Sequence, residues 1–296
     1  MVNVSKKDLE KIFSALIIPM NDDESINEEA LASLVYRELQ DGVEGFYVCG
    51  SSGEGLLLSL EERKRVLEVV MKEAGDRVPV IAHVGTIRTA DAAELAKHAQ
   101  QAGVCAVSMI PPYYYHFSME EITRYYKDIL AAVPGLPGII YNIPQFTGIE
   151  FSKQNAGELL SDPDIIGVKH TSQNLYSLER MHDAYPDKVL FNGFDEQFIG
   201  AYQMGATAAI GTTVNLFAPL FLEARALLLA GDNEGAHRVQ KQINERVELM
   251  VSVGIFNATK YLWTLRGVPC GNCRRPFKPL TEQQRKILEE AAQRWA

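Results

Sequence analysis

Eight short, mostly apolar segments alternate with longer amphipathic segments along this chain of 296 residues. The apolar segments cover residues 13–20, 45–50, 79–84, 106–111, 138–143, 165–171, 189–194 and 208–213. Near-continuous apolar character is typical of parallel strands that are covered on both faces. Eight such strand–helix units predict an α/β protein whose sheet closes into a (β/α)8 TIM barrel. A doubly wound open sheet is the alternative, but the start of the chain lacks the dinucleotide-binding fingerprint that often accompanies it.

The amphipathic segments predict the helices of the barrel and a further helical region after it. Residues 60–74 are preceded by Ser59 and carry Glu62, an arrangement typical of a capping box. Further helices are predicted over residues 27–40, 89–102, 219–229, 233–251, 255–266 and 281–296. The last three have no strand between them. We therefore expect a barrel over residues 1–230 and a C-terminal helical extension over residues 231–296, packed on it as a single structural unit.

The composition limits the partners and the compartment. Hydrophobic residues make up 47% of the chain and charged residues 23%, as in a globular protein with a large core. A net charge of −9 argues against nucleic acid as a partner. No stretch approaches the roughly 20 apolar residues that span a membrane, and the first residues lack a signal core. With only four cysteines, the protein is expected to be cytoplasmic.

Neither the cysteines nor the histidines predict a metal site. Cys270 and Cys273 form a C-x-x-C pattern, but no second Cys or His pair follows at a suitable spacing. The pattern lies between Pro269 and Pro276 in a segment typical of turns, so we expect incidental thiols. The six histidines show no paired spacing typical of metal ligands.

Lys169 lies near the end of the sixth predicted strand, within an otherwise apolar run. Burying an ammonium group without a partner is unfavourable, and desolvation favours the neutral amine. A neutral lysine amine attacks carbonyl groups and forms a Schiff base. The alternative is a strand-end lysine whose amine extends to solvent.

In a TIM barrel the active site lies at the carboxyl ends of the strands. The second predicted strand ends in a glycine-rich turn, residues 50–55, that carries Ser51 and Ser52. Hydroxyl groups and free backbone N–H groups in such a turn favour an anion, and a carboxylate fits better than a nucleotide phosphate. The alternative is an ordinary connection between a strand and a helix.

The ends of three other strands add side chains to the same open end of the barrel. Tyr141 ends the fifth strand, where a phenol is placed to transfer protons. Residues 113–115 are three tyrosines after the fourth strand, and each alone is more typical of a packed or interface residue. Strand alternation places Lys169 and Thr171 on one face, so His170 is expected to face the helices.

Asp195 and Glu196 follow the seventh strand, and residues 211–215 follow the eighth. Adjacent carboxylates beside hydroxyl groups can hold a polyol through charge-assisted hydrogen bonds, although both also suit the first turn of a helix. An amine nucleophile, an anion-binding turn, a phenol and polyol-binding groups around one mouth indicate an imine-forming aldolase that uses no metal.

These motifs resemble those of the N-acetylneuraminate lyase and dihydrodipicolinate synthase family of class I aldolases, over about residues 13–277. The signposts are residues 50–54, 141–144 and 167–172. Residues 113–114, 117–118, 192–196 and 274–277 resemble the sialic acid lyase branch. The synthase branch carries an arginine shortly after the Tyr-Asn-x-Pro motif, where this chain has Gln145, Phe146 and Thr147.

The resemblance implies reversible cleavage of N-acetylneuraminate, a sialic acid, to N-acetylmannosamine and pyruvate, with no cofactor, no metal, and no nucleic-acid or membrane partner. It implies that the catalytic residues are Lys169, Tyr141, Ser51 and Tyr114. It implies substrate contacts at Ser51, Ser52, Thr171, Gly193, Asp195, Glu196, Gly211 and Thr212. Tyr114 would reach a neighbouring subunit's site, which implies a homotetramer.

Three other functions stay open on the sequence. A related pyruvate-dependent aldolase could act on a shorter 2-keto-3-deoxy sugar acid, because that substrate is also a polyol. A dihydrodipicolinate synthase is disfavoured by the missing arginine. A barrel that binds a ligand without turnover is a different class of function, and the joint presence of Lys169, Tyr141 and Ser51 argues against it.

Overall fold

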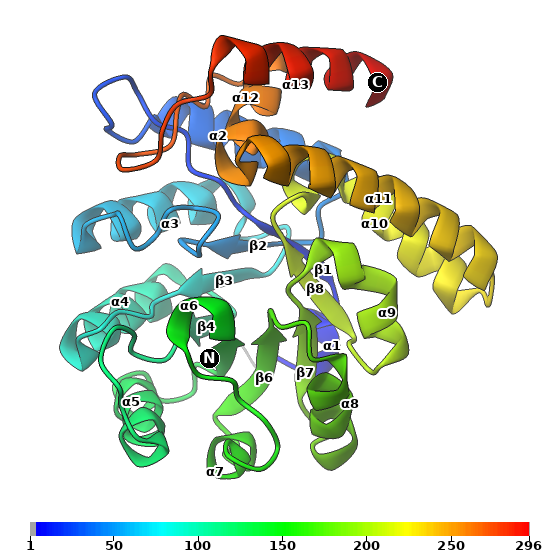
Figure 1. Ribbon diagram of the computed structural model, residues 1–296. Helices are drawn as coiled ribbons and strands as arrows, with labels where there is room; N and C mark the ends of the chain where they lie inside the picture. Colours follow the sequence, from blue (N-terminus) through cyan, green and yellow to red (C-terminus); the bar gives the residue numbers. More distant parts are fainter. Residues whose placement is uncertain (1–3, 296) are drawn as a thin grey trace.

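Eight parallel strands close into a barrel in chain order in the computed structural model, which describes residues 4–295 (Figure 1). The strands are β1 Ile12–Ala15, β2 Gly45–Val48, β3 Val80–His83, β4 Ala106–Met109, β5 Gly138–Asn142, β6 Ile165–His170, β7 Val189–Asn192 and β8 Ala208–Gly211. Residue Phe13 of β1 pairs with Ile210 of β8, which closes the sheet. The predicted TIM barrel is confirmed, and the open-sheet alternative is wrong.

The first strand is shorter than the predicted segment 13–20, because the side chain of Asn215 bonds to the backbone where the strand ends. The amide group of Asn215 donates to the Ala15 carbonyl at 2.9 Å and accepts from the Ile17 N–H at 3.1 Å. A side chain thus takes the place of a neighbouring strand, and the chain leaves the sheet after Ala15. Residues Leu16 and Ile18 beyond it are still fully buried, which is why the apolar run extends past the strand.

Helices surround the barrel and continue beyond it. They are α1 Lys6–Leu9, α2 Glu28–Gln40, α3 Leu60–Ala74, α4 Thr89–Ala102, α5 Met119–Ala131, α6 Pro144–Thr147, α7 Gly157–Leu160, α8 Leu175–Ala184, the 3-10 turn η1 Asp195–Gln197, α9 Phe198–Gln203, α10 Val214–Leu229, α11 Asn233–Val253, α12 Ile255–Leu265 and α13 Glu282–Trp295. The predicted capping box at the start of α3 is present, with Ser59 and Glu62 bonded reciprocally. Helix α10 begins five residues before the predicted 219–229, because the chain is already helical ahead of Pro219 and kinks at Phe217.

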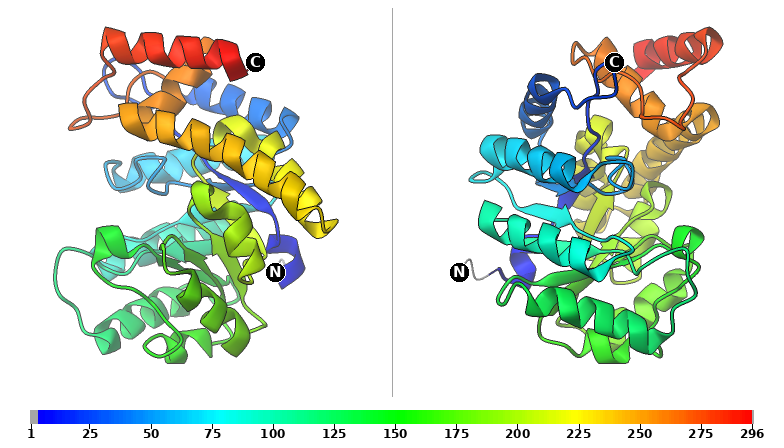
Figure 2. Two further views of the ribbon diagram at one scale, coloured as in Figure 1. Left: turned by 45° about the vertical axis from the view of Figure 1, so that its right-hand side comes forward. Right: turned by 90° about the vertical axis from the view of Figure 1, so that its left-hand side faces the viewer.

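Helices α11, α12 and α13 gather on the side of the barrel where α2 and α10 lie (Figures 1 and 2). The turn between α10 and α11 contains residue 230, the predicted limit of the barrel. Buried side chains of the three helices, among them Ile243, Trp263 and Leu288, join the same core as the barrel helices. The division at residue 230 stays a prediction.

The buried residues form two layers, one inside the barrel and one between the strands and the helices. In β1, Phe13 and Ala15 belong to the inner layer and Ile12 to the outer layer. The same alternation in β6 sends Val168 outward. It leaves Lys169 on the inner face, opposite Tyr141 in the register of β5 and β6.

Candidate active site

A cavity of about 220 Å³ opens at the carboxyl ends of the strands. All but two of the predicted site residues line it, namely Ser51, Ser52, Tyr141, Lys169, Thr171, Gly193, Asp195, Glu196 and Thr212. A larger cavity of about 430 Å³ lies between α10, α12 and α13, but it contains none of these residues. The chemistry of the residues that line a cavity, rather than the volume of the cavity, therefore locates the candidate site.

Lys169 points into the barrel and is only 4% exposed. Its Nζ lies 4.2 Å from the ring centre of Tyr47 and 3.9 Å from that of Tyr141. Within residues 4–295, no carboxylate lies at ion-pair distance from this amine. Burial lowers the pKa of Lys169, while Tyr141 and Asp195 act in the opposite direction. The solvent-directed alternative is wrong, and the amine is held where its neutral form is favoured.

Tyr141 lies beside this amine on the neighbouring strand, with 3% of its surface exposed. Its hydroxyl group is 3.4 Å from the Ser51 hydroxyl. Its ring contacts the rings of Tyr47 and His83 edge to face, which fixes the phenol in place. A phenol between a nucleophilic amine and a second hydroxyl group is positioned to transfer a proton.

The turn after β2 brings Ser51 and Ser52 to the lining of the cavity, with Ser51 beside Tyr141. The Ser52 hydroxyl lies 2.7 Å from the Thr212 hydroxyl, so it is joined to the end of β8. Backbone bonds close the turn, from Gly55 N–H to the Gly50 carbonyl at 3.0 Å and from Glu54 N–H to the Ser51 carbonyl at 3.1 Å. The turn is therefore a compact loop with hydroxyl groups at the cavity rather than an extended connection.

Asp195 is buried, and its carboxylate bonds across the site rather than to its own helix. Its Oδ2 accepts from the backbone N–H and from the hydroxyl group of Thr213, both at 2.7 Å. Burial raises the pKa of Asp195 to about 6, although these two bonds favour the ionised form. Phe194, not Asp195, occupies the N-cap position of η1, but Asp195 and Glu196 both lie in the first turn of that helix, as the alternative expected.

Two predicted residues lie outside the cavity lining. Gly211 packs against Asp195, and a Cβ atom there would lie 1.9 Å from the Asp195 Oδ1. In this position Gly211 makes room for the carboxylate. Tyr114 is 83% exposed and has a φ of 78°, so its side chain does not reach the site of its own chain.

A comparison with known protein families identifies the family of this chain. The model of the dihydrodipicolinate synthetase family matches residues 8–295. The chain belongs to this family. The N-acetylneuraminate lyase of Rhizobium meliloti (strain 1021) is 44% identical over 283 residues, which cover 96% of this chain and 94% of the relative.

Solved structures of similar proteins have the same architecture over nearly the whole chain. The crystal structure of CdNal from Clostridium difficile in complex with mannosamine has a TM-score of 0.95 and 34% identity, and covers 97% of this chain and 99% of that one. The N-acetylneuraminate lyase from Fusobacterium nucleatum complexed with pyruvate has a TM-score of 0.93 and 36% identity, with 98% of each chain covered.

In this family member, the C-terminal extension forms part of the cavity wall, which the sequence did not predict. Val247 and Val251 of α11 and Ile255 and Phe256 of α12 line the cavity. Their helical spacing indicated an apolar face, but not which part of the barrel that face would cover. Tyr47 was also missed, because a tyrosine inside a strand is more typical of a packed residue.

The remaining predictions concern residues and properties that take no part in the proposed reaction. His170 faces the helices, where its ring lies 3.0 Å from the Asn142 amide nitrogen and 3.1 Å from the Asn174 carbonyl. Cys270 and Cys273 are buried free thiols, and burial raises the pKa of each to about 12. Within residues 4–295, no cluster of His, Cys, Asp and Glu forms a metal site. In the same range, no helix is long and apolar enough to cross a bilayer. Cytoplasmic location stays a prediction.

Proposed function

We propose that this protein is a class I aldolase that cleaves N-acetylneuraminate reversibly to N-acetylmannosamine and pyruvate. The observation that carries the proposal is the buried Lys169 amine, which has no carboxylate partner within residues 4–295 and shares a cavity with Tyr141 and Ser51. The curated relatives named N-acetylneuraminate lyase support the substrate. So do the mannosamine-bound and pyruvate-bound family structures.

The first half of the reaction forms the imine. The hydroxyl groups of Ser51 and Ser52 and the backbone N–H groups of their turn hold the carboxylate of the open-chain 2-keto acid. The neutral Lys169 amine attacks the keto carbon, and uptake of one proton with loss of water gives a protonated imine. The positive charge on the imine nitrogen then makes it an acceptor for an electron pair.

The second half breaks the bond between carbons 3 and 4. Tyr141 relays the proton of the hydroxyl group on carbon 4, passing its own phenolic proton toward the Ser51 hydroxyl as it accepts, and carbon 4 becomes the aldehyde of N-acetylmannosamine as the bond breaks. The bonding electrons move to the imine and give an enamine. Protonation at carbon 3 and hydrolysis then release pyruvate and restore the Lys169 amine. No step requires a metal or a cofactor.

The sugar end of the substrate lies on the far side of the cavity. We assign its contacts to Thr171, Gly193, Asp195, Glu196, Gly211 and Thr212. Asp195 and Glu196 supply acceptors for several sugar hydroxyl groups, and the ionised form of Asp195 makes the stronger hydrogen bonds. Gly211 acts here through the position that it gives to Asp195.

Tyr114 completes the site of a neighbouring copy in a homotetramer. Its large exposure and its edge-to-face contact with the exposed Tyr115 support a role at an interface. Coexpression of a Lys169→Ala chain with a Tyr114→Phe chain tests this arrangement. Mixed assemblies should regain turnover that neither variant has alone, because one kind of shared site contains both native residues. Absence of any recovery in mixed tetramers would contradict the shared site.

The decisive experiment is release of pyruvate from N-acetylneuraminate by the purified protein in the presence of excess chelator. Turnover at an ordinary enzymatic rate supports both the substrate and the metal-free mechanism. A parallel assay with 2-keto-3-deoxygluconate tests the shorter-substrate alternative. Preference for that substrate would retain the imine chemistry and replace the assigned sugar.

A further inference from the structure

We infer that the buried ion pair between Glu54 and Lys260, with the adjoining Arg274, positions the Ser51–Ser52 turn for the substrate carboxylate. Through these residues the C-terminal extension would set the affinity of the site for 2-keto acids. The inference rests on the proposed function, because it assigns positioning residues to the carboxylate-binding step. None of the three was among the predicted catalytic or substrate-binding residues.

The turn adopts a conformation that needs support from outside. Cys49 and Glu54, at its two ends, have left-handed φ values of 59° and 54°, which are unfavourable for residues with side chains. A Cβ atom on Gly55 would lie 1.9 Å from the Cys49 carbonyl oxygen, so the two ends of the turn are in close approach. Such geometry persists only where the surroundings hold it.

Glu54 supplies that hold on the turn. Its Oε1 lies 2.5 Å from the Nζ of Lys260, and the side chains of both residues are fully buried. Its Oε2 accepts from the backbone N–H of Arg274 at 2.6 Å. The Lys260 amine in turn donates to the Asn272 carbonyl at 3.1 Å. One carboxylate therefore binds the turn both to α12 and to the segment that follows it.

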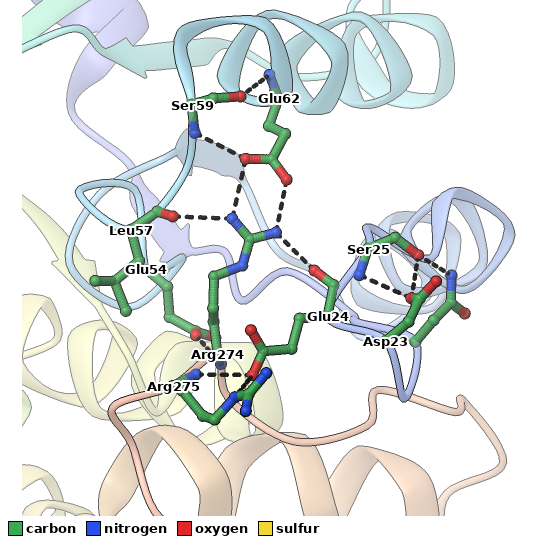
Figure 3. Close-up of polar contacts among 10 residues, drawn as sticks. Asp23, Glu24, Ser25, Glu54, Leu57, Ser59, Glu62, Arg274 and Arg275 are labelled. Carbon is green, nitrogen blue, oxygen red and sulfur yellow. Dashed lines mark hydrogen bonds and ion pairs between the residues drawn. The ribbon is translucent and has the colours of Figure 1, made fainter.

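The Arg274 side chain extends this connection to the segment that follows the turn and to the loop before α2 (Figure 3). Its guanidinium group binds the Glu62 carboxylate at 2.6 and 2.9 Å. It also donates to the Leu57 carbonyl at 2.8 Å and to the Glu24 carbonyl at 2.6 Å. The loop from the turn to the start of α3 is thus fastened at both ends to one extension segment.

The same helix that carries Lys260 also forms part of the substrate cavity, through Ile255 and Phe256. Space filling alone does not explain a fully buried pair of charges, because apolar side chains of the same volume often give equal or greater stability. An ion pair differs from an apolar contact in fixing where its two ends lie. Its ends here are the carboxylate-binding turn and the cavity wall.

The test compares two ketones that differ only in the carboxylate. Borohydride reduction followed by intact mass measurement records imine formation at Lys169 with pyruvate and with acetone, over a range of concentrations. In Lys260→Met and in Glu54→Gln, we expect the half-saturating concentration of pyruvate to rise about tenfold or more, as for other misplaced binding groups. The rate of acetone trapping should stay unchanged, because acetone has no carboxylate to hold.

Two further variants serve as controls. One controls for loss of folding stability, and the other for effects of any substitution near Arg274. The double variant Glu54→Gln/Lys260→Met leaves no unpaired buried charge, and we expect it to melt near the wild type yet retain the weak pyruvate binding. Arg275→Gln removes the neighbouring, 84% exposed arginine that pairs with Glu24, and it should leave both ketones unaffected.

The outcomes separate the inference from the proposed function. Equal losses with pyruvate and acetone, or unchanged pyruvate binding, would overturn the positioning role. Wild-type pyruvate affinity in the double variant would overturn it as well, because stability alone would then explain the pair. A wild-type protein that traps no pyruvate would overturn the proposed function, and the inference with it.

Discussion

Two of the buried lysines lie in different regions of this molecule, and their partners differ. Lys169 lies at the mouth of the barrel, 4% exposed, between the rings of Tyr47 and Tyr141. Lys260 lies where the extension meets the turn after β2, fully buried and 2.5 Å from the Glu54 carboxylate. The ion pair of Lys260 with Glu54 joins two segments of the chain. An unpaired lysine beside a cavity is favoured in its neutral form, which is the form that reacts with carbonyl groups.

The substitution Lys169→Met removes the amine proposed to react with the substrate, and of the substitutions considered it should reduce turnover the most. Without the amine no imine forms, so borohydride should add no pyruvate-derived mass and turnover should fall by about 10⁴-fold or more. Lys188→Met is the matched control, since Lys188 is also buried but donates to the Asp162 and Ile165 carbonyls. Its folded protein should still trap pyruvate, and trapping by Lys169→Met would contradict the assignment of the nucleophile.

Tyr141→Phe removes the proton carrier and keeps the ring that lies over the Lys169 amine. We expect kcat to fall by about 10²- to 10³-fold, as for the loss of a general acid–base group, while KM changes little. Pyruvate trapping should continue, because imine formation precedes cleavage of the bond between carbons 3 and 4. Steady-state kinetics check this split. A change in KM alone would make Tyr141 a binding residue.

Asp195→Asn tests the buried carboxylate at the same mouth. The folded-state pKa of about 6 lies above the ordinary value of 3.8, so its contribution to stability is complete near pH 4 and is lost as the pH rises through 6. The variant keeps an oxygen acceptor for Thr213. We expect it to be more stable than the wild type by up to about 3 kcal/mol above pH 6, with no difference near pH 4.

Chemical denaturation at the two pH values measures this difference. Loss of the carboxylate should also raise KM for the sugar acid, while the half-saturating pyruvate concentration in trapping stays the same. A pH-independent stability difference would show that Asp195 does not titrate in the way that its burial implies. An increased half-saturating pyruvate concentration would place Asp195 at the carboxylate rather than at the sugar.

The barrel was predictable from the sequence because its signal is repeated and local. Each strand is a short apolar run and each helix an amphipathic one, so even the limits of α3 and α4 agree with the predicted 60–74 and 89–102. Residues at strand ends, such as Lys169 and Tyr141, were predictable because parallel strands bring their carboxyl ends to one mouth. These predictions needed only the direction of each strand.

The connections made by the extension were not predictable in this way. Glu54 and Lys260 are separated by about two hundred positions, and nothing local in either segment indicates the other. Both lysines occur in apolar surroundings in the sequence, so their patterns alone do not distinguish the proposed nucleophile, Lys169, from the proposed positioning residue, Lys260. The distinction depends on whether the tertiary fold brings a carboxylate to the amine, as it does for Lys260.

Glu38 sharpens this distinction, because it is buried and unpaired yet lies away from the cavity. It is fully buried on α2 beside the Ser14 hydroxyl, and within residues 4–295 no cation lies at ion-pair distance. Burial raises the pKa of Glu38 well above its ordinary value. Lack of a partner therefore does not by itself make a buried group catalytic, and access to a ligand is also needed.

We expect Glu38→Gln to leave kcat and KM unchanged and to alter only stability. The native protein keeps the Glu38 proton over a range in which the unfolded chain loses it, so the stability that this residue contributes is complete below about pH 4.3 and declines as the pH rises. Glutamine does not titrate, so the variant should gain stability relative to the wild type on going from pH 4 to pH 8. Unfolding by chemical denaturant at the two pH values measures this gain in stability. The control is Glu29→Gln, because Glu29 is an exposed residue on the same helix. A gain in both variants would reflect net charge rather than burial, whereas loss of turnover in Glu38→Gln would connect α2 to the active site.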